Sequence, residues 1–542
     1  MAAAAALSFE YIGRNVILTR DKGKAAENIT ENAYANYTAE VESTGRTDIE
    51  LIPREIYLKL IEPDRLVLNN TKKNHRGTDR FPPAIARAIK PYQAECVWEM
   101  VRARRALNAC LMGMGKSIQA ICTIALLRDP SKGGDVVVCP GGLRSNWSAE
   151  IKKWAPDMNV HMIDSVGTDP AQIQLRITQL FSFSDGLTII SYELFARLAG
   201  LLSMSARKLA RFNTIVCDES HYLKETTSVR YKALRMHLLH AHNLFLLSGT
   251  PSPNRPVELF AQLQLLDSAT FRSKETFSMR YCDGFIDQWG RFNARGASRE
   301  RELAILLSRY MIRVTVNPDI SSVELREVHR VVTEVEIEGL ATNHAEQVRD
   351  VIQAVSSGAA AMNDVQSTVS ALFLETARLK VGPILVLLRE RLAGLIDEKV
   401  VLFCTHMVMF EAVKAELETS LPGKKHIAIN GLTPMRGREA MVAEFLGPGD
   451  CRVALLTLGT CSTGINLVPV RHAIFLELDW TPAIIHQAEC RINRIGGAAS
   501  LYYEYLIAPN TLDDYVYRML HRKSETICAI VDRGHTDAFN FG

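Results

Sequence analysis

The loop Gly113–Ser117 (GMGKS) contains residue types that bind phosphate groups. Glycines allow backbone N–H groups to wrap around phosphate oxygens, a lysine neutralises those oxygens, and a serine hydroxyl can bind Mg²⁺. The apolar spacing of residues 118–127 is typical of a helix packed on a sheet. The same short string also occurs as a simple strand-to-helix turn, and Cys110 stands where the full phosphate-loop pattern has a glycine. The loop therefore needs support from other parts of the chain.

Two further motifs stand at the ends of apolar runs. Asp218 and Glu219 close the run TIVCDE, and residues 248–251 (SGTP) close the run that begins at Leu244. Parallel sheets bind ligands at the carboxyl ends of their strands, where one carboxylate can hold Mg²⁺ and its neighbour can orient water. In isolation, the acidic pair could be a helix N-cap or a solvated loop, and SGTP could be an ordinary turn. Together with the glycine loop, in this order, they favour a nucleotide site.

A pair of arginines near the C-terminus could complete such a site. Arg491 and Arg494 are three residues apart and therefore share a face if this segment is helical. A guanidinium is always charged and binds phosphate oxygens through two parallel hydrogen bonds. The alternative is a solvated or salt-bridged helix face.

The elements that must position these residues follow an alternating pattern. From residue 81 onward, short apolar runs are separated by longer amphipathic stretches, which is typical of parallel strands joined by helices. We predict two α/β halves, with strands at residues 135–140, 187–191, 214–218, 244–248, 399–405, 452–458 and 472–478.

A chain of 542 residues exceeds what one hydrophobic core usually supports. We predict an N-terminal segment of no assigned role at 1–80, a first lobe at 81–330, an alanine-rich helical segment at 331–385 and a second lobe at 386–542. The N-terminal segment contains one possible hairpin, FEYIGRNVILT, with Gly13 in its turn.

The overall composition excludes several classes of protein. The 63 basic and 60 acidic residues nearly cancel, so any polyanion would be bound by local patches, for which residues 72–76, 102–105 and 207–211 are candidates. Eleven cysteines without zinc-ligand spacing favour a reducing compartment over a disulfide framework or a zinc site. The start of the chain is a poor signal peptide, and no apolar run reaches the length of about 18 residues that a membrane span needs.

Taken together, the motifs resemble those of the Swi/Snf-related ATPases of helicase superfamily two, from about residue 90 to residue 523. The strings RYCDG, ELDWTPAIIHQAE and NTLDDYVYRMLHRK look most like the annealing-helicase, fork-remodelling branch. The strings that carry the wider resemblance are KPYQ, PGGLRSNWSAEIKKW, SYELF, DESH, LLSGTPSPNRPVELF, VVLFCTH, NGLTPMRGREAMVAEF, LTLGTCSTGINL and QAECRINRIG.

The resemblance implies a DNA-dependent ATPase with two RecA-like P-loop NTPase lobes, ATP and Mg²⁺ as cofactors, and double-stranded or branched DNA as partner. It implies a DNA translocase that remodels forks, branched DNA or protein–DNA complexes, acting as a monomer inside the cell, and in the nucleus if the source is eukaryotic. The nucleotide-binding residues it implies are Gln93 on the adenine, then Gly113, Met114, Gly115, Lys116, Ser117 and Gly464.

The resemblance also assigns catalytic and coupling roles. Ser117 and Asp218 would hold Mg²⁺, and Glu219 would orient the attacking water. Arg491 and Arg494 would act from the second lobe, together with Lys116 of the first. The residues expected to couple nucleotide state to DNA grip are Ser248, Thr250 and Gln487, with Gly464 in a motif of the same kind.

Several positions depart from the family pattern. Cys110 and Leu111 replace two acidic residues, and Cys490, Asn493 and Gly497 replace an aspartate, a histidine and a glutamine. None of these changes removes a group assigned to chemistry, so we expect activity with an altered rate or coupling. Two alternatives stay open, an ATP-switched DNA-binding clamp with little turnover and an RNA helicase of the same superfamily.

Overall fold

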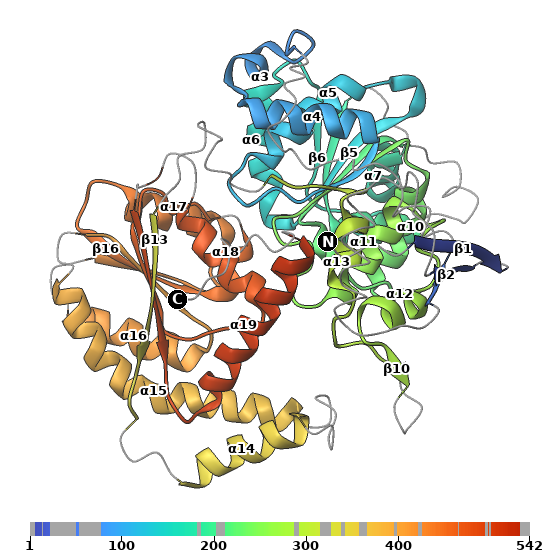
Figure 1. The fold of residues 1–542 in the computed structure, drawn as a ribbon. Coiled ribbons are helices and arrows are strands. Elements are labelled where there is room, and N and C mark those ends of the chain that lie inside the picture. Colours follow the sequence, from blue (N-terminus) through green and yellow to red (C-terminus); the bar gives the residue numbers. More distant parts are fainter. Residues whose placement is uncertain are drawn as a thin grey trace. The chain divides into compact units, whose positions relative to one another are not determined.

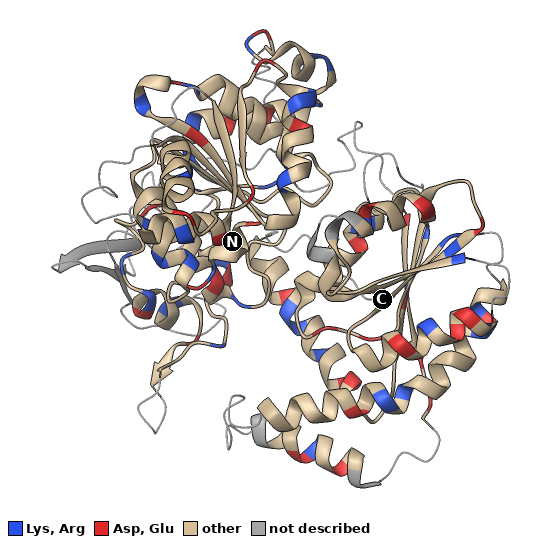
Figure 2. Ribbon diagram, turned by 180° about the vertical axis from the view of Figure 1, so that it is seen from behind, with Lys and Arg blue, Asp and Glu red and all other residues tan. Residues whose placement is uncertain are grey.

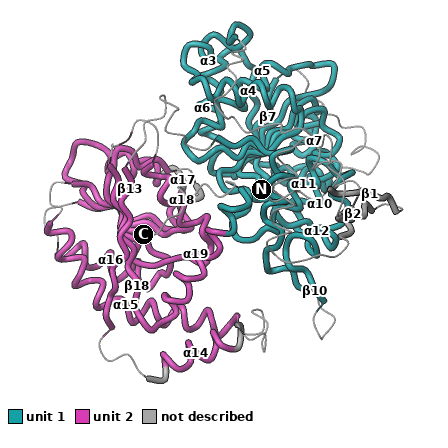
Figure 3. Tube along the Cα trace, viewed as in Figure 1, with its two compact units in different colours: residues 1–315, 526–535 teal, residues 316–525, 536–542 magenta. Residues whose placement is uncertain are grey.

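The structure is a computed structural model that describes most of the chain beyond residue 76. The described residues are 6–12, 15–21, 50–53, 77–181, 186–201, 212–286, 292–314, 327–337, 342–356, 366–394, 398–420, 425–463, 465–493, 497 and 500–531. The chain divides into two compact units, residues 1–315 with 526–535 and residues 316–525 with 536–542 (Figure 3). Each unit is described by itself.

Unit 1 is built on a seven-stranded sheet whose neighbouring strands are all parallel (Figure 1). The strand order is β12-β4-β9-β8-β5-β7-β6. The strands are β4 (Arg105–Asn108), β5 (Gly134–Cys139), β6 (Val160–Ile163), β7 (Leu187–Ser191), β8 (Phe212–Asp218), β9 (Asn243–Leu247) and β12 (Met311–Ile312). The four strands predicted for this half are present within two residues of their predicted ends.

Helices cover this sheet because its central strands are apolar on both faces. Every residue of β5, β7 and β9 is buried, as expected where each face of a parallel sheet packs against helices. The helices of unit 1 are α3 (Pro83–Ala88), α4 (Pro91–Ala103), α5 (Lys116–Leu127), α6 (Arg144–Trp154), α7 (Pro170–Phe181), α8 (Tyr192–Leu201), α10 (Val229–His240), α11 (Leu259–Leu266), α12 (Lys274–Tyr281) and α13 (Glu300–Leu307). A short ribbon of β10 (Phe285–Ile286) and β11 (Phe292–Asn293) follows α12.

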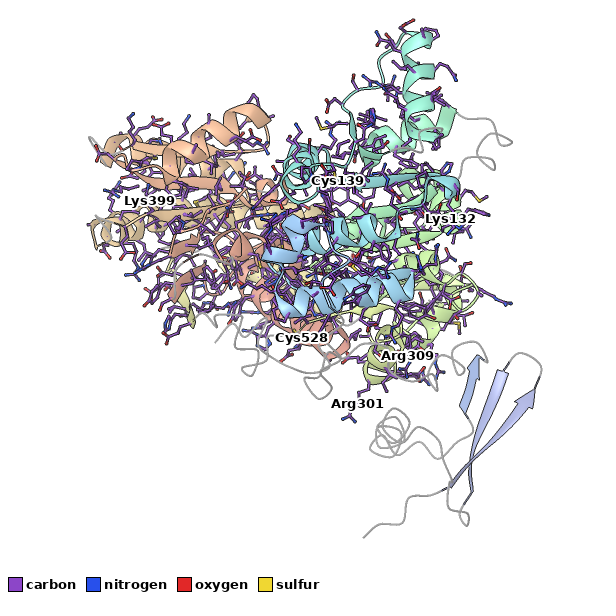
Figure 4. The ribbon with its side chains drawn as sticks, turned by 90° about the horizontal axis from the view of Figure 1, so that it is seen from above. Lys132, Cys139, Arg301, Arg309, Lys399 and Cys528 are labelled. Atoms are coloured by element: carbon purple, nitrogen blue, oxygen red, sulfur yellow. The ribbon has the colours of Figure 1, made fainter. Side chains whose placement is uncertain are left out.

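The burial of individual side chains agrees with a sheet covered by helices. Cys139, at the end of β5, is buried in the sheet, whereas Arg301 at the start of α13 is exposed and points away from the body of the unit (Figure 4). The structure describes the side chains of ten of the eleven cysteines, and all ten are buried thiols outside disulfide bonds.

Unit 2 contains a six-stranded parallel sheet in the order β13-β18-β17-β14-β16-β15. Its strands are β13 (Glu327–Glu334), β14 (Val400–Cys404), β15 (Lys425–Ile429), β16 (Cys451–Thr457), β17 (His472–Phe475) and β18 (Ser500–Ile507). Its helices are α14 (Thr342–Ser356), α15 (Gln366–Gly394), α16 (Met407–Ser420), α17 (Met435–Leu446), α18 (Pro482–Ile492) and α19 (Leu512–Val531), the last of which ends in unit 1. The predicted α/β fold class is therefore confirmed for both halves.

The segment predicted to be helical holds more than helices. Residues 331–385 contain α14 and much of α15, but they also contain half of β13, which pairs along its whole length with β18. Strand β13 lies at the edge of the sheet, so it lacks the continuous apolar run that identifies the central strands. The N-terminal stretch of unit 1 ends at Thr315, ahead of this strand, and the domain boundaries set from the sequence stay predictions.

The N-terminal segment contributes a small separate sheet. Strand β1 (Ala6–Ile12) pairs antiparallel with β2 (Asn15–Asp21), which pairs with β3 (Glu50–Pro53). The first pairing agrees with the predicted hairpin, although Gly13 lies outside the described residues.

Candidate nucleotide site

Three neighbouring strands of unit 1 deliver the predicted site residues to one edge of the sheet. Strand β9 lies between β4 and β8, and all three run parallel. The glycine loop follows β4, the SGTP motif follows β9, and the acidic pair follows β8. Because parallel strands end at the same edge, motifs that are far apart in the sequence come together there.

The glycine loop needs its glycines for conformation. Gly113 and Gly115 have φ angles of 80° and 78°, in the left-handed region that residues with a Cβ rarely adopt. Gly115 is the N-cap of α5, so the first backbone N–H groups of that helix are presented at the loop. The N–H groups of a helix's first turn and the helix dipole together favour an anion at such a position.

The Lys116 ammonium is held by the loop itself. Its Nζ donates to the carbonyl oxygens of Cys110 at 2.9 Å and Leu111 at 3.2 Å. A Cβ added to Gly249 would lie 3.4 Å from this nitrogen and 2.5 Å from Met112 Cγ. The second residue of the SGTP motif therefore leaves the space that Met112 occupies beside the lysine.

Gln93 lies against the glycine loop. Its Oε1 accepts from the backbone N–H of Lys90 at 3.0 Å, closing the N-terminus of α4, and its Nε2 donates to the Met114 carbonyl at 3.0 Å. Tyr92 Oη and Gln119 Nε2 donate to the same carbonyl. The structure thus brings Gln93 to the loop, and its contact with adenine stays a prediction.

Asp218 is oriented by hydrogen bonds on both carboxylate oxygens. Trp147 Nε1 donates to Oδ2 at 2.8 Å, and the backbone N–H of Glu219 donates to Oδ1 at 3.0 Å. Burial, and then the charge of Glu219, raise the pKa of Asp218 to about 6, while Lys116 opposes this shift. Each carboxylate oxygen has a second lone pair beyond these bonds, so the residue fits the hard, oxygen-preferring Mg²⁺ ion.

A chain of contacts joins Glu219 to the SGTP motif. His221 Nδ1 lies 3.3 Å from Glu219 Oε2 and 3.3 Å from Ser248 Oγ. Ser248 Oγ in turn accepts from the backbone N–H of Thr250 at 3.2 Å. The predicted water-orienting residue and two predicted coupling residues are therefore linked through one imidazole.

The backbone of Glu219 itself is unusual. Its φ and ψ angles are 49° and 53°, so a residue with a long side chain occupies the left-handed region where the chain turns from β8 into a short 3₁₀ helix at Ser220–Leu223. Such a conformation costs about 1–2 kcal/mol for a residue with a Cβ. Strain of this kind is typical of residues held for function.

Other residues of this edge were given no role from the sequence. Trp147 and Tyr192 lie in strings that carry the family resemblance, and Tyr192 Oη donates to the Asp218 carbonyl at 2.7 Å. Arg313, beyond β12, donates to the Ala109 carbonyl at 2.6 Å. It stands in no motif, so only the fold reveals it.

In unit 2, the buried helix α18 carries the predicted Arg491 and Gln487. Arg491 is only 4% exposed, and among the described residues its Nε has no hydrogen-bond partner. A buried donor without a partner is rare in proteins and is consistent with a group that binds a ligand. Arg494 and Gly464 lie outside the described residues.

One predicted basic patch is partly used inside the fold. Arg105 donates to the carbonyl oxygens of Leu238, Ala241, Leu265 and Leu266, which ties β4 to α10 and α11. Arg102 pairs with Glu99 on the same helix face. The patch at 102–105 is thus smaller than predicted, and the candidates at 72–76 and 207–211 lie outside the described residues.

Comparison with known families decides the assignment. Residues 92–372, over half of the chain, match the SNF2-related domain. The chain belongs to the SNF2-related family. Residues 384–496 match the helicase conserved C-terminal domain.

Relatives of this SNF2-related chain include named annealing helicases. It is 30% identical over 465 residues to the mouse DNA annealing helicase and endonuclease ZRANB3, covering 84% of this chain and 42% of that protein. It is 28% identical over 505 residues to the Xenopus laevis SWI/SNF-related matrix-associated actin-dependent regulator of chromatin subfamily A-like protein 1, covering 91% of this chain and 49% of that protein. The chain thus spans less than half the length of either relative.

One solved structure is also similar to this chain. The Sulfolobus solfataricus SWI2/SNF2 ATPase core in complex with dsDNA is 19% identical, covers 84% of this chain and 95% of that one, and superposes with a TM-score of 0.38. Within the described residues, no cluster of three or more His, Cys, Asp or Glu side chains could hold a metal ion. No described helix combines the length and the apolar character that a membrane crossing requires.

Proposed function

We propose that this SNF2-related chain is a DNA-dependent ATPase that translocates along duplex DNA and remodels forks, branched DNA or protein–DNA complexes. The observation that carries the proposal is the convergence of three motifs at one sheet edge, namely the glycine loop, the acidic pair after β8 and the SGTP motif after β9. The names of the relatives, an annealing helicase and a chromatin regulator, support DNA as the partner.

The proposed chemistry assigns each group a task. The N-terminus of α5 and Lys116 bind the β- and γ-phosphates, and Ser117 with Asp218 holds Mg²⁺. When bound, the ion neutralises charge on the phosphate oxygens. Glu219 orients the attacking water, and His221 links its carboxylate to Ser248. Gln93 and Gly464 complete the proposed nucleotide contacts.

The second unit would supply positive charge to the transferring phosphoryl group. Arg491 and Arg494 are the proposed donors, and the unpartnered Nε of Arg491 supports this role. Arginines of this kind act on the charge that develops in the transition state rather than on ground-state binding. Thr250 and Gln487 would couple the nucleotide state to the grip on DNA.

We infer that DNA is bound through its phosphate backbone by a monomer inside the cell, or inside the nucleus if the source is eukaryotic. Backbone binding is independent of sequence, which suits a motor that moves along DNA.

The decisive experiment is to measure ATPase rates with single-stranded DNA, duplex DNA, forked DNA and RNA at one fixed salt concentration. We expect duplex or forked DNA to stimulate hydrolysis most, and Lys116→Ala to remove the activity. ATP binding without stimulation by any DNA would instead support an ATP-switched DNA-binding clamp with little turnover. The observation that favours the clamp is that Cys110 and Leu111 replace two acidic residues of the family pattern. Greater stimulation by RNA would support an RNA helicase.

A further inference from the structure

Glu489 of α18 is a buried carboxylate within unit 2, 3% exposed, that lies two residues before Arg491. Arg330 on β13 donates to it twice, from Nε to Oε1 at 3.0 Å and from Nη2 to Oε2 at 2.9 Å. Tyr505 of β18 donates a further hydrogen bond to Oε1. The side chain is therefore tied to two adjacent strands of the second sheet.

The main chain of the same helical turn is also fixed. Tyr503 Oη donates to the Glu489 carbonyl at 3.2 Å, and the carbonyl of Arg491 accepts from the backbone N–H of Leu467 at 3.0 Å. The last turn of α18 is thus anchored to the sheet on one side of Arg491 and to the segment before β17 on the other.

The charge balance of this cluster depends on Arg330. Burial alone would raise the pKa of Glu489, but the charge of Arg330, together with His486, holds that pKa at about 2. The carboxylate is therefore ionised. A buried ion pair loses most when one partner is removed, because the remaining charge is left uncompensated. Without Arg330, Glu489 would keep the Tyr505 hydrogen bond and His486, whose Nδ1 lies 3.7 Å from Oε2, but it would lose its two bonds to β13, so the last turn of α18 would be held less firmly.

We propose that Arg330 is a positioning residue for Arg491, acting through Glu489 on the last turn of α18. This inference rests on the proposed function, since it assumes that Arg491 assists ATP hydrolysis. Arg330 does not take part in the chemistry itself. Its effect is to hold the backbone from which the Arg491 side chain extends.

The test compares Arg330→Met with wild type in the full chain. We expect kcat for DNA-stimulated hydrolysis to fall by about 10- to 100-fold, because small misplacements of a catalytic group have effects of this size. KM for ATP should stay within about twofold of wild type, because the proposed phosphate contacts come from unit 1. Arg330→Lys, which keeps the charge but loses the paired hydrogen bonds, should recover part of kcat.

A second buried ion pair in unit 2 provides the matched control. Lys380 Nζ donates to Asp513 at 2.6 Å, and both side chains are almost fully buried. Lys380→Met should lower the melting temperature yet retain kcat at a temperature where all variants are folded. An equal loss of kcat in this control would show that Arg330 acts only through general stability, and would overturn the inference.

The remaining outcomes are also distinguishable. Wild-type protein without DNA-stimulated turnover would overturn the proposed function, and the inference with it. Wild-type turnover together with a folded Arg330→Met variant of unchanged kcat would overturn the inference alone. If Arg330→Met does not fold, the double variant Arg330→Met with Glu489→Gln removes both charges together. An unchanged kcat in that double variant would also overturn the inference alone.

Discussion

At the scale of single residues, the site depends on groups whose donors and acceptors are nearly all accounted for. Asp218 accepts on both oxygens and Lys116 is held by two loop carbonyls, whereas Arg491 keeps an unpartnered Nε among the described residues. The residues of unit 1 are thus organised before ATP binds. Arg491 of unit 2 and Thr250 of unit 1 each keep a buried polar atom without a hydrogen-bond partner among the described residues.

Replacing Arg491 should separate ATP binding from hydrolysis. We expect Arg491→Ala to bind ATP as wild type does and to lose turnover by about 1,000-fold, since such arginines stabilise the transition state. Equilibrium binding of a fluorescent ATP analogue, measured beside single-turnover hydrolysis, checks both parts. Normal hydrolysis by this variant would show that the assigned role is wrong.

The ionised state of Glu489 predicts a dependence of stability on pH. Because folding lowers its pKa to about 2, the carboxylate contributes stability that is fully present above the pKa of the unfolded chain, about 4.3, and is lost as pH falls through the folded value. Urea unfolding should show wild type more stable than Glu489→Gln by a constant amount from about pH 7 to 5.5, and by less below about pH 4.5. A difference independent of pH would contradict an ionised Glu489. Glu375→Gln, in an exposed pair with Arg378, is the control.

At the scale of elements, the ends of β4 and β9 are in steric contact. A Cβ at Gly249 would meet Met112 at 2.5 Å and Lys116 at 3.4 Å. We therefore expect Gly249→Ala to fold but to raise KM for ATP several-fold, because the added methyl group clashes with Met112 and shifts the loop whose carbonyl oxygens hold Lys116. Steady-state ATPase kinetics measure this effect. Gly200→Ala in α8, where nothing lies within 4 Å of the new Cβ, should behave as wild type.

Some strands could be predicted from the sequence, and others could not. The central strands were predictable because both faces are buried, which leaves continuous apolar runs such as DVVVC and NLFLL. Strand β13 was missed because it lies at the edge and reads EVHRVVTE, and β4 was missed because it has only four residues. The predicted site motifs are local strings at strand ends, so sequence reading could find them.

Contacts between distant parts of the chain were not predictable in this way. Arg330 and Glu489 are 159 residues apart, and Arg313 and Ala109 are 204 residues apart. Neither arginine stands in a motif, and each acquires its partner only when the sheets form. The residues that hold a site in place are thus harder to predict than the residues that do its chemistry.

At the scale of the whole molecule, charge is distributed without a dominant sign. Basic and acidic segments alternate along the helices of both units (Figure 2), in keeping with a formal charge of +3. The proposed DNA binding would therefore rest on local patches rather than on the net charge. We expect the DNA concentration for half-maximal ATPase stimulation to rise steeply with salt, linearly on logarithmic scales, while the rate without DNA changes little. A stimulation that is insensitive to salt would argue against backbone binding.

At Glu219, the residue that would best stabilise the left-handed backbone is not the residue that the proposed ATP hydrolysis requires. Glycine has no Cβ and adopts this conformation freely, so Glu219→Gly should be about 1 kcal/mol more stable than Glu219→Ala, although both variants lack the carboxylate and should not hydrolyse ATP. Thermal unfolding of the two variants checks this difference, and equal melting temperatures would contradict it. A search for thermostable variants that ignored turnover would thus favour glycine at this position, and would turn the proposed motor into a protein that could only bind its nucleotide.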